Sequence, residues 1–145
     1  MATAGRVDGR HSAARVSSEI LDRLPPQNLD AERGVLGSLL LDPVLCDEVA
    51  LILRAEDFYA DAHRKLCHHM ITMHGEGGRL DTTLLVERLR QAGDLEAVGG
   101  TAFLAEILQA VPVAAHATYY ARIVRDHAML RRLLERHRLD PATLV

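Results

Sequence analysis

The sequence predicts an all-α protein in which a compact bundle of five to six helices is followed by one long C-terminal helix. Apolar residues recur at intervals of three and four positions, which is the period of a helix with one buried face. Proline, glycine and aspartate separate these segments, and no segment alternates in the manner of a strand. We therefore divide the chain into a flexible N-terminal arm, a helical globular domain, a long helix for self-association or partner docking, and a tail, over residues 1–24, 25–112, 113–138 and 139–145.

The composition limits the classes of function. A chain of 145 residues with a hydrophobic content of 48% suits one domain with a substantial core. The net charge of −3 gives no overall basic field for nucleic acid, and an aromatic content of 3% argues against a base-stacking platform. Neither a membrane-length apolar run nor a signal peptide is evident, so we expect a cytoplasmic protein with its two cysteines reduced.

The segment 25–43 predicts the central helix of the fold. Two prolines precede it, and Asn28 is placed to cap its first free N–H groups. Leucine and valine side chains form one stripe along the helix. Gly34 and Gly37 lie on neighbouring turns, where we expect them to let another backbone come close. Two interior glycines cost about 1 kcal/mol each relative to alanine, which indicates a helix held by packing.

Apolar stripes predict the remaining helices and their ends. Asp81 and Thr101 are expected to cap two of them, and Gly93 lies just past the end of one. In the connector over residues 54–60, Phe58 and Tyr59 are expected to fill space in the core. The predicted helices cover residues 43–53, 61–74, 82–92, 102–111 and 114–137.

A His and Cys pair in the third helix is the strongest metal candidate. His63 and Cys67 are four residues apart on one helical face, a spacing found among zinc ligands. His74 lies two turns further along, and His68 and His69 are expected to point away. The alternative is that the pair packs in the core, with His63 hydrogen-bonded to a nearby carbonyl. We favour the core and expect no metal.

Catalysis is poorly supported by the sequence. The phosphate-binding pattern GxxxxGK[S/T] is absent, and the single lysine, Lys65, falls inside a predicted helix. Asp57 and Asp61 flank the connector, where we expect solvated caps rather than an acid/base pair. We therefore expect no catalytic residue and no cofactor in this chain.

The C-terminal helix is rich in arginine. It contains six arginines, one aspartate and one glutamate, which gives the helix a net charge of +4. The alternatives are a solvated face or contacts to phosphates or an acidic partner, so a stand-alone DNA-binding domain is the second candidate function. A helix of this length overhangs a domain of this size, so part of its stripe should need a partner surface. The candidate contact residues are Arg122, Arg125, Arg131 and Arg132.

Four segments together resemble a known family in their order and roughly in their spacing. The first three read LPPQNLDAERGVLGSLLLDP, DFYADAHRKLCHHM and LDTTLLVERLRQAGDLEAVGGTAFLAEIL, and the fourth covers residues 112–134. They resemble the N-terminal domain of bacterial replicative DNA helicases of the DnaB family.

The resemblance implies a helical globule followed by a helical hairpin, in a domain that does not hydrolyse ATP. In that family the hairpins pair to build the collar of a hexameric ring, and the collar recruits primase. A helicase loader is a further possible partner, and DNA contact is expected to be indirect or weak. ATP and magnesium would belong to a motor domain that, like the second hairpin helix, is absent from this chain. The residues that inherit the pairing and docking role are Tyr119, Tyr120, Ile123, Val124, Leu130, Leu133 and Leu134.

Overall fold

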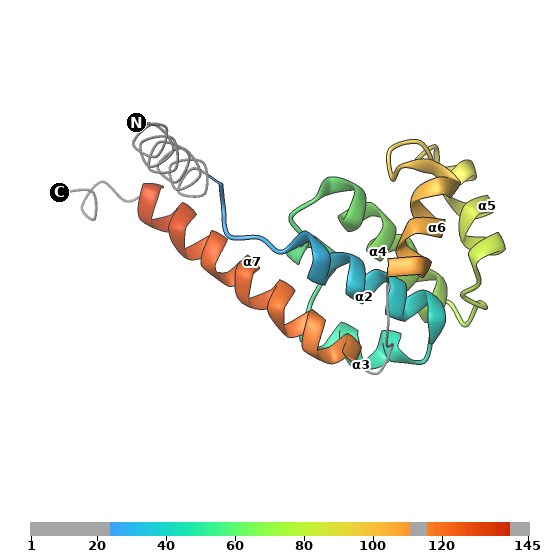
Figure 1. Cartoon of the computed structure of the whole chain (residues 1–145), viewed down its shortest axis with the longest axis horizontal. Helices are drawn as coiled ribbons and strands as arrows, with labels where there is room; N and C mark the ends of the chain where they lie inside the picture. The colour runs from blue at the N-terminus through green and yellow to red at the C-terminus, as the bar shows by residue number, and fades with distance from the viewer. Residues whose placement is uncertain (1–23, 111–115, 140–145) are drawn as a thin grey trace, which may run out of the picture.

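Helix α2 lies in the middle of the fold, with the other helices arranged around it (Figure 1). The structure, a computed structural model, describes residues 24–110 and 116–139. Over these residues the chain is all-helical and contains no strand, as the sequence predicts. The elements are α2 (Leu29–Leu41), α3 (Leu45–Ile52), the 3₁₀ turn η1 (Ala55–Asp57), α4 (Asp61–Gly75), α5 (Thr82–Ala92), α6 (Gly100–Ala110) and α7 (Ala117–Leu139).

The central position of α2 follows from its sequence. Asn28 caps the helix, because its side-chain Oδ1 accepts a hydrogen bond from the backbone N–H of Ala31 at 3.0 Å. Val35, Leu36 and Leu39 are fully buried. The helix packs against α3, α4, α6 and α7, so burial on nearly all sides supplies the stability that its two glycines remove.

Gly34 is the place where α7 approaches α2 closely. A Cβ atom at this position would lie only 2.7 Å from Cδ2 of Tyr120. The sequence predicts the close approach but not its partner, because an aromatic ring rather than a backbone occupies the space. A ring fits there because glycine leaves a flat hollow on the helix surface.

Helices α4, α5 and α6 enclose the rest of the core on the side of α2 away from α7 (Figure 1). Phe58 plugs this core from the connector as predicted, whereas Tyr59 is only half-buried at its edge. The largest fully buried side chains outside α2 are Val49, Phe58, Leu66, Met70, Leu85, Leu89, Leu104 and Ile107.

The helix ends agree with the predictions where a local signal marks them. Asp81 caps α5 by accepting a hydrogen bond from the N–H of Leu84 at 2.9 Å, and Gly93 ends that helix in the left-handed conformation. Helix α6 already begins at Gly100, so Thr101 lies in its first turn rather than at its cap. Gly99 and Gly100 both have positive φ, and they form the turn that leads into α6.

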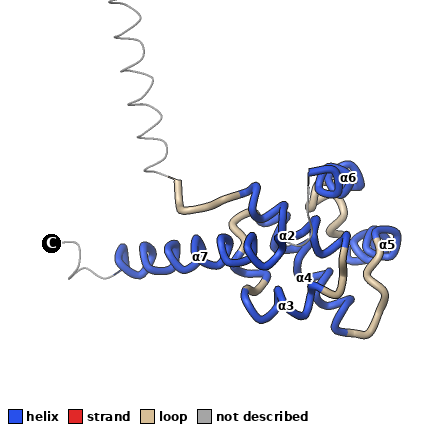
Figure 2. The backbone as a smooth tube through the Cα atoms, turned by 60° about the horizontal axis from the view of Figure 1, so that its bottom comes forward, coloured by secondary structure: helices blue, strands red, loops and turns tan. Residues whose placement is uncertain are grey.

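Helix α7 has 23 residues and is therefore about 35 Å long. Its first half packs on α2 and α3, and its second half projects beyond the globule (Figures 1 and 2). From position 129 to position 138 every residue except Arg131 is exposed. The predicted overhang is therefore present. The predicted N-terminal arm up to residue 23, the start of the last helix at Ala114 and most of the tail lie outside the described residues.

Candidate interaction surface on helix α7

The inward face of α7 is built from small side chains. Ala117, Ala121, Val124 and Ala128 recur at helical spacing and are at most 2% exposed. Alanine at three of these positions lets the helix lie close against α2 and α3. This face anchors the first half of α7 to the globule, together with the partly buried Tyr120 and Ile123 beside it.

The outward side of the second half carries the large apolar residues instead. We define the α7 stripe as the four residues Met129, Leu130, Leu133 and Leu134. Their relative exposures are 50%, 48%, 59% and 51%. Exposed apolar residues that follow one another along a projecting helix are typical of a surface that binds another protein. Met129 is not among the residues predicted from the sequence, although its apolar character and its position next to Leu130 were available signals.

The structure separates the predicted pairing residues into two groups. Tyr119 is 66% exposed and shares the outward side of α7 with the leucines of the α7 stripe. Tyr120 and Ile123 are partly buried against the core, and Val124 belongs to the core itself. The exposed members are therefore Tyr119, Leu130, Leu133 and Leu134.

Arg131 ties α7 to two distant segments of the globule. Its guanidinium group donates hydrogen bonds to the carbonyl oxygen of Pro26 at 2.7 Å and to that of Asp57 at 2.5 Å. It also lies over the Tyr59 ring, 5.6 Å from the ring centre. Partial burial lowers the pKa of Arg131 from its usual value. We call these four residues, Arg131, Pro26, Asp57 and Tyr59, the Arg131 clamp.

The neighbouring Arg132 explains why Asp57 is buried. Arg132 forms an ion pair with Oδ1 of Asp57, whose Oδ2 accepts a hydrogen bond from the N–H of Arg54 at 2.9 Å. Asp57 is only 4% exposed, so the expectation of a solvated cap was wrong. Its carboxylate is buried because a cation from a helix 75 positions later in the sequence pairs with it.

The arginines proposed as phosphate contacts are thus divided as well. Arg131 and Arg132 bind groups of this chain, although Arg132 remains exposed, whereas Arg122 and Arg125 are exposed and make no such contact with a distant segment of the described chain. Arg125 lies 3.7 Å from the carboxylate of its neighbour Asp126. Fewer guanidinium groups than the sequence suggested are consequently placed for binding DNA phosphates.

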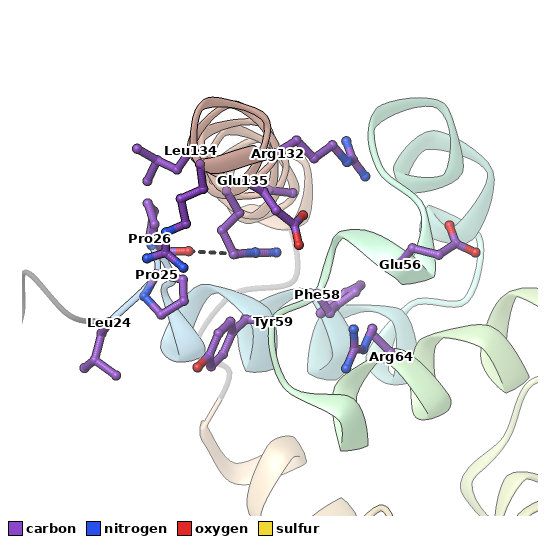
Figure 3. Close-up of a pocket in the computed structure, with 13 residues that line it drawn as sticks. Leu24, Pro25, Pro26, Glu56, Phe58, Tyr59, Arg64, Arg132, Leu134 and Glu135 are labelled. Atoms are coloured by element: carbon purple, nitrogen blue, oxygen red, sulfur yellow. Dashed lines mark hydrogen bonds between the residues drawn. The ribbon is translucent and has the colours of Figure 1, made fainter. Parts of the chain in front are cut away.

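A groove of about 570 Å³ lies where α7, the Pro25–Pro26 segment and the connector meet (Figure 3). Leu134 borders it from α7, and the hydrogen bond to Pro26 crosses it as a dashed line in Figure 3. Phe58 and Tyr59 also line it, so the groove combines apolar surface with charged residues. The charged residues that line it are Glu56, Arg64, Arg131, Arg132, Glu135 and Arg138.

The His and Cys pair is part of the core. His63 is 4% exposed, and its Nδ1 lies 2.7 Å from Oε1 of the buried Glu32. Glu32 also accepts hydrogen bonds from the N–H groups of Tyr59 and Ala60. The expected carbonyl partner of His63 was therefore wrong, because a carboxylate from α2 takes its place. Within the described ranges there is no group of three or more potential metal ligands.

Both cysteines are free and buried. Burial raises the pKa of Cys46 to about 11, and burial raises the pKa of Cys67 still further. The reactive thiolate form is therefore scarce at neutral pH. None of the helices that the structure describes is both long and apolar enough to span a membrane.

The structure is that of an all-helical domain with one projecting helix that carries an exposed apolar surface. Comparison with known sequences shows which family of helical domains this is. The model of the family described as "DnaB-like helicase N terminal domain" matches residues 24–126. The chain belongs to this family.

Two curated relatives show how much of a longer protein the chain resembles. It is 42% identical over 113 residues to the replicative DNA helicase DnaB of Geobacillus stearothermophilus, covering 78% of this chain and 25% of the relative. It is 41% identical over 126 residues to the same-named protein of Treponema pallidum, covering 87% of this chain and 29% of the relative. The chain thus spans about a quarter of the length of these relatives.

A solved structure shows the same fold. The N-terminal domain of DnaB helicase from Mycobacterium tuberculosis matches with a TM-score of 0.75 and 39% sequence identity. The match covers 77% of this chain and 81% of that one. The resemblance and the fold class inferred from the sequence are both confirmed.

Proposed function

We propose that this chain is a non-catalytic scaffold domain of a replicative DNA helicase, which acts in DNA replication in the bacterial cytoplasm. In this role it self-associates through the outward side of α7, as a building block of a hexameric ring, and provides a docking surface for primase or a helicase loader. Helicase activity itself would belong to a motor domain outside this chain. The observation that carries the proposal is the α7 stripe, four apolar side chains about half exposed on a projecting helix.

The energetics favour weak self-association of this chain alone. Completing the burial of a leucine that is already half-buried gains roughly 1 kcal/mol, so the stripes of two copies together gain about 6–12 kcal/mol. Association costs an estimated 4–15 kcal/mol in lost translational and rotational freedom. Only the favourable end of these ranges leaves a surplus of about 4–7 kcal/mol, so we expect at most a weak dimer with a dissociation constant of about 10 µM to 1 mM.

Sedimentation equilibrium tests the self-association. We expect the wild type to show reversible dimerisation in this range, and Leu134→Ala to weaken it without unfolding the globule. Leu84→Ala on α5 is the matched control, because Leu84 is 46% exposed but lies on a different helix. A tight dimer at nanomolar concentration, or equal effects of the two substitutions, would contradict the proposal.

A pull-down against primase tests the docking role. The wild type and Leu84→Ala should retain primase, whereas a Leu130→Ala/Leu134→Ala double variant should retain less. Circular dichroism of the double variant should match that of the wild type, because neither leucine belongs to the core. Equal retention by all three proteins would show that primase does not use this surface.

A further inference from the structure

Helix α3 presents an exposed stripe that the fold does not use. Its inward face consists of Cys46, Val49 and the following Leu53, all at most 2% exposed. The opposite side carries Leu51 at 89% exposure, which is the most exposed large apolar side chain that the structure describes, and Val44 at 71%, which is the N-cap residue just before the helix and has helical backbone angles. These two positions are seven residues apart and therefore lie on the same side of the helix.

Two acidic residues lie between them on the same side. Asp47 and Glu48 follow Val44 by three and four positions and are both exposed. Asp47 remains 81% exposed at its side chain although its carboxylate is 3.2 Å from Nε2 of His74. We define the α3 stripe as Val44, Asp47, Glu48 and Leu51. Between positions 41 and 52 the chain has three acidic residues and no lysine or arginine, a net charge of −3.

The far end of α7 is the complement of this surface in both charge and apolar character. Met129 and Leu133 are exposed on its outward side, and Arg125 and Arg136 flank them. Without Arg132, which pairs with Asp57, the helix has five arginines against one aspartate and one glutamate, a net charge of +3. An acidic stripe with an apolar residue at each end thus matches a basic surface with apolar residues at its centre.

The two surfaces are too far apart to meet within one chain. Helix α3 packs beside the beginning of α7, and the far end of α7 projects away from it (Figures 1 and 2). In a two-fold arrangement with antiparallel α7 helices, however, the far end of each α7 lies beside the beginning of the other. Each far end then lies near the α3 of the other copy, and both contacts form at once.

We propose that the α3 stripe of one copy binds the Met129, Leu133 and Arg136 side of α7 in a second copy. This inference rests on the proposed self-association and identifies the surface on the second copy that receives α7. The contact is isologous, so every dimer contains it twice. Because the charged groups are exposed, added salt should weaken the dimer.

Charge reversal on each side tests the contact. Glu48→Arg and Arg136→Glu should each weaken dimerisation about tenfold in sedimentation equilibrium at low salt, because each variant places like charges together in both contacts. Glu106→Arg, at an exposed position of α6, is the matched control and should leave the dissociation constant unchanged. All three substitutions are at exposed positions, so thermal unfolding should confirm an intact fold.

Mixing the two weakened variants gives the decisive result. A heterodimer of Glu48→Arg with Arg136→Glu has one native contact and one contact with the charges exchanged, and no like-charge contact. The equimolar mixture should therefore dimerise with about the wild-type affinity, and so should the double variant. Failure of the mixture to recover would overturn the proposed contact.

Other outcomes separate this inference from the proposed function. If the charge reversals have no effect while Leu134→Ala weakens the dimer, the α3 stripe is not the receiving surface and self-association through α7 still stands. If the wild type remains monomeric at about 1 mM, both proposals are overturned.

Discussion

Helix α2 and the second half of α7 both carry leucines at helical spacing, yet they lie in opposite environments. Leu36 of α2 is completely buried, whereas Leu134 of α7 is 51% exposed. Helix α2 is surrounded by α3, α4, α6 and the first half of α7, whereas the end of α7 extends past the other helices (Figure 1). The comparison shows that an apolar stripe indicates a buried surface but does not say whether its own chain or another molecule covers it.

The largest expected effect is in α2. Leu36→Ala should lower the free energy of unfolding by about 2–5 kcal/mol, because it removes a large side chain from a packed core. Chemical denaturation monitored by circular dichroism measures the loss. The comparison fails if Leu36→Ala and Leu134→Ala lower the stability equally.

The second effect tests the polar part of the α2 environment. Glu32→Gln removes one of two acceptor oxygens that bind Tyr59, Ala60 and His63, and should lower the free energy of unfolding by about 1.5–3 kcal/mol. Glu106→Gln at an exposed position of α6 is the control, again in chemical denaturation. Equal stability of these two variants would mean that the carboxylate contributes nothing to the core.

The third effect lies at the boundary between the two regions. Arg131→Ala removes the hydrogen bonds to Pro26 and Asp57 and should cost about 1–2 kcal/mol, since the guanidinium group is only partly buried. It should also broaden the distribution of distances between spin labels on α4 and on the end of α7. The exposed Arg125→Ala should change neither quantity, and an unchanged distribution in Arg131→Ala would show that the clamp does not position the helix.

The smallest effect on stability is expected in the α7 stripe. Leu134→Ala should change the free energy of unfolding by less than about 0.5 kcal/mol, as is usual for an exposed position. Thermal unfolding at a concentration well below the dissociation constant measures the isolated globule. A loss above about 1 kcal/mol would show that Leu134 belongs to the core of its own chain.

Local sequence signals were sufficient for much of the fold. Asn28 and Asp81 cap their helices as predicted, because a cap is defined by residues three positions apart. Gly93 ends α5 as predicted, because its left-handed conformation favours glycine. The period of the apolar residues was likewise enough to identify every α-helix that the structure describes, whereas the 3₁₀ turn η1 was not predicted.

The site was harder to predict because its residues are defined by distant partners. Asp57 is buried by Arg132, and Glu32 is buried among groups 27 to 31 positions away. Val124 has the same apolar character as the residues of the α7 stripe, but it is buried in the core rather than exposed to solvent. Composition and period predict that α7 has an apolar side, whereas only the packing shows where that side leaves the globule.

An amide NMR dilution series of the wild-type chain tests the central claim most directly, because it observes both regions in one sample. As the concentration falls through the expected dissociation constant, the signals of residues 129–134 in α7 should shift, and those of α2 should stay in place. Shifts concentrated in α2, or a spectrum in which the end of α7 does not change with concentration, would contradict the assignment of α2 to folding and of the α7 stripe to association.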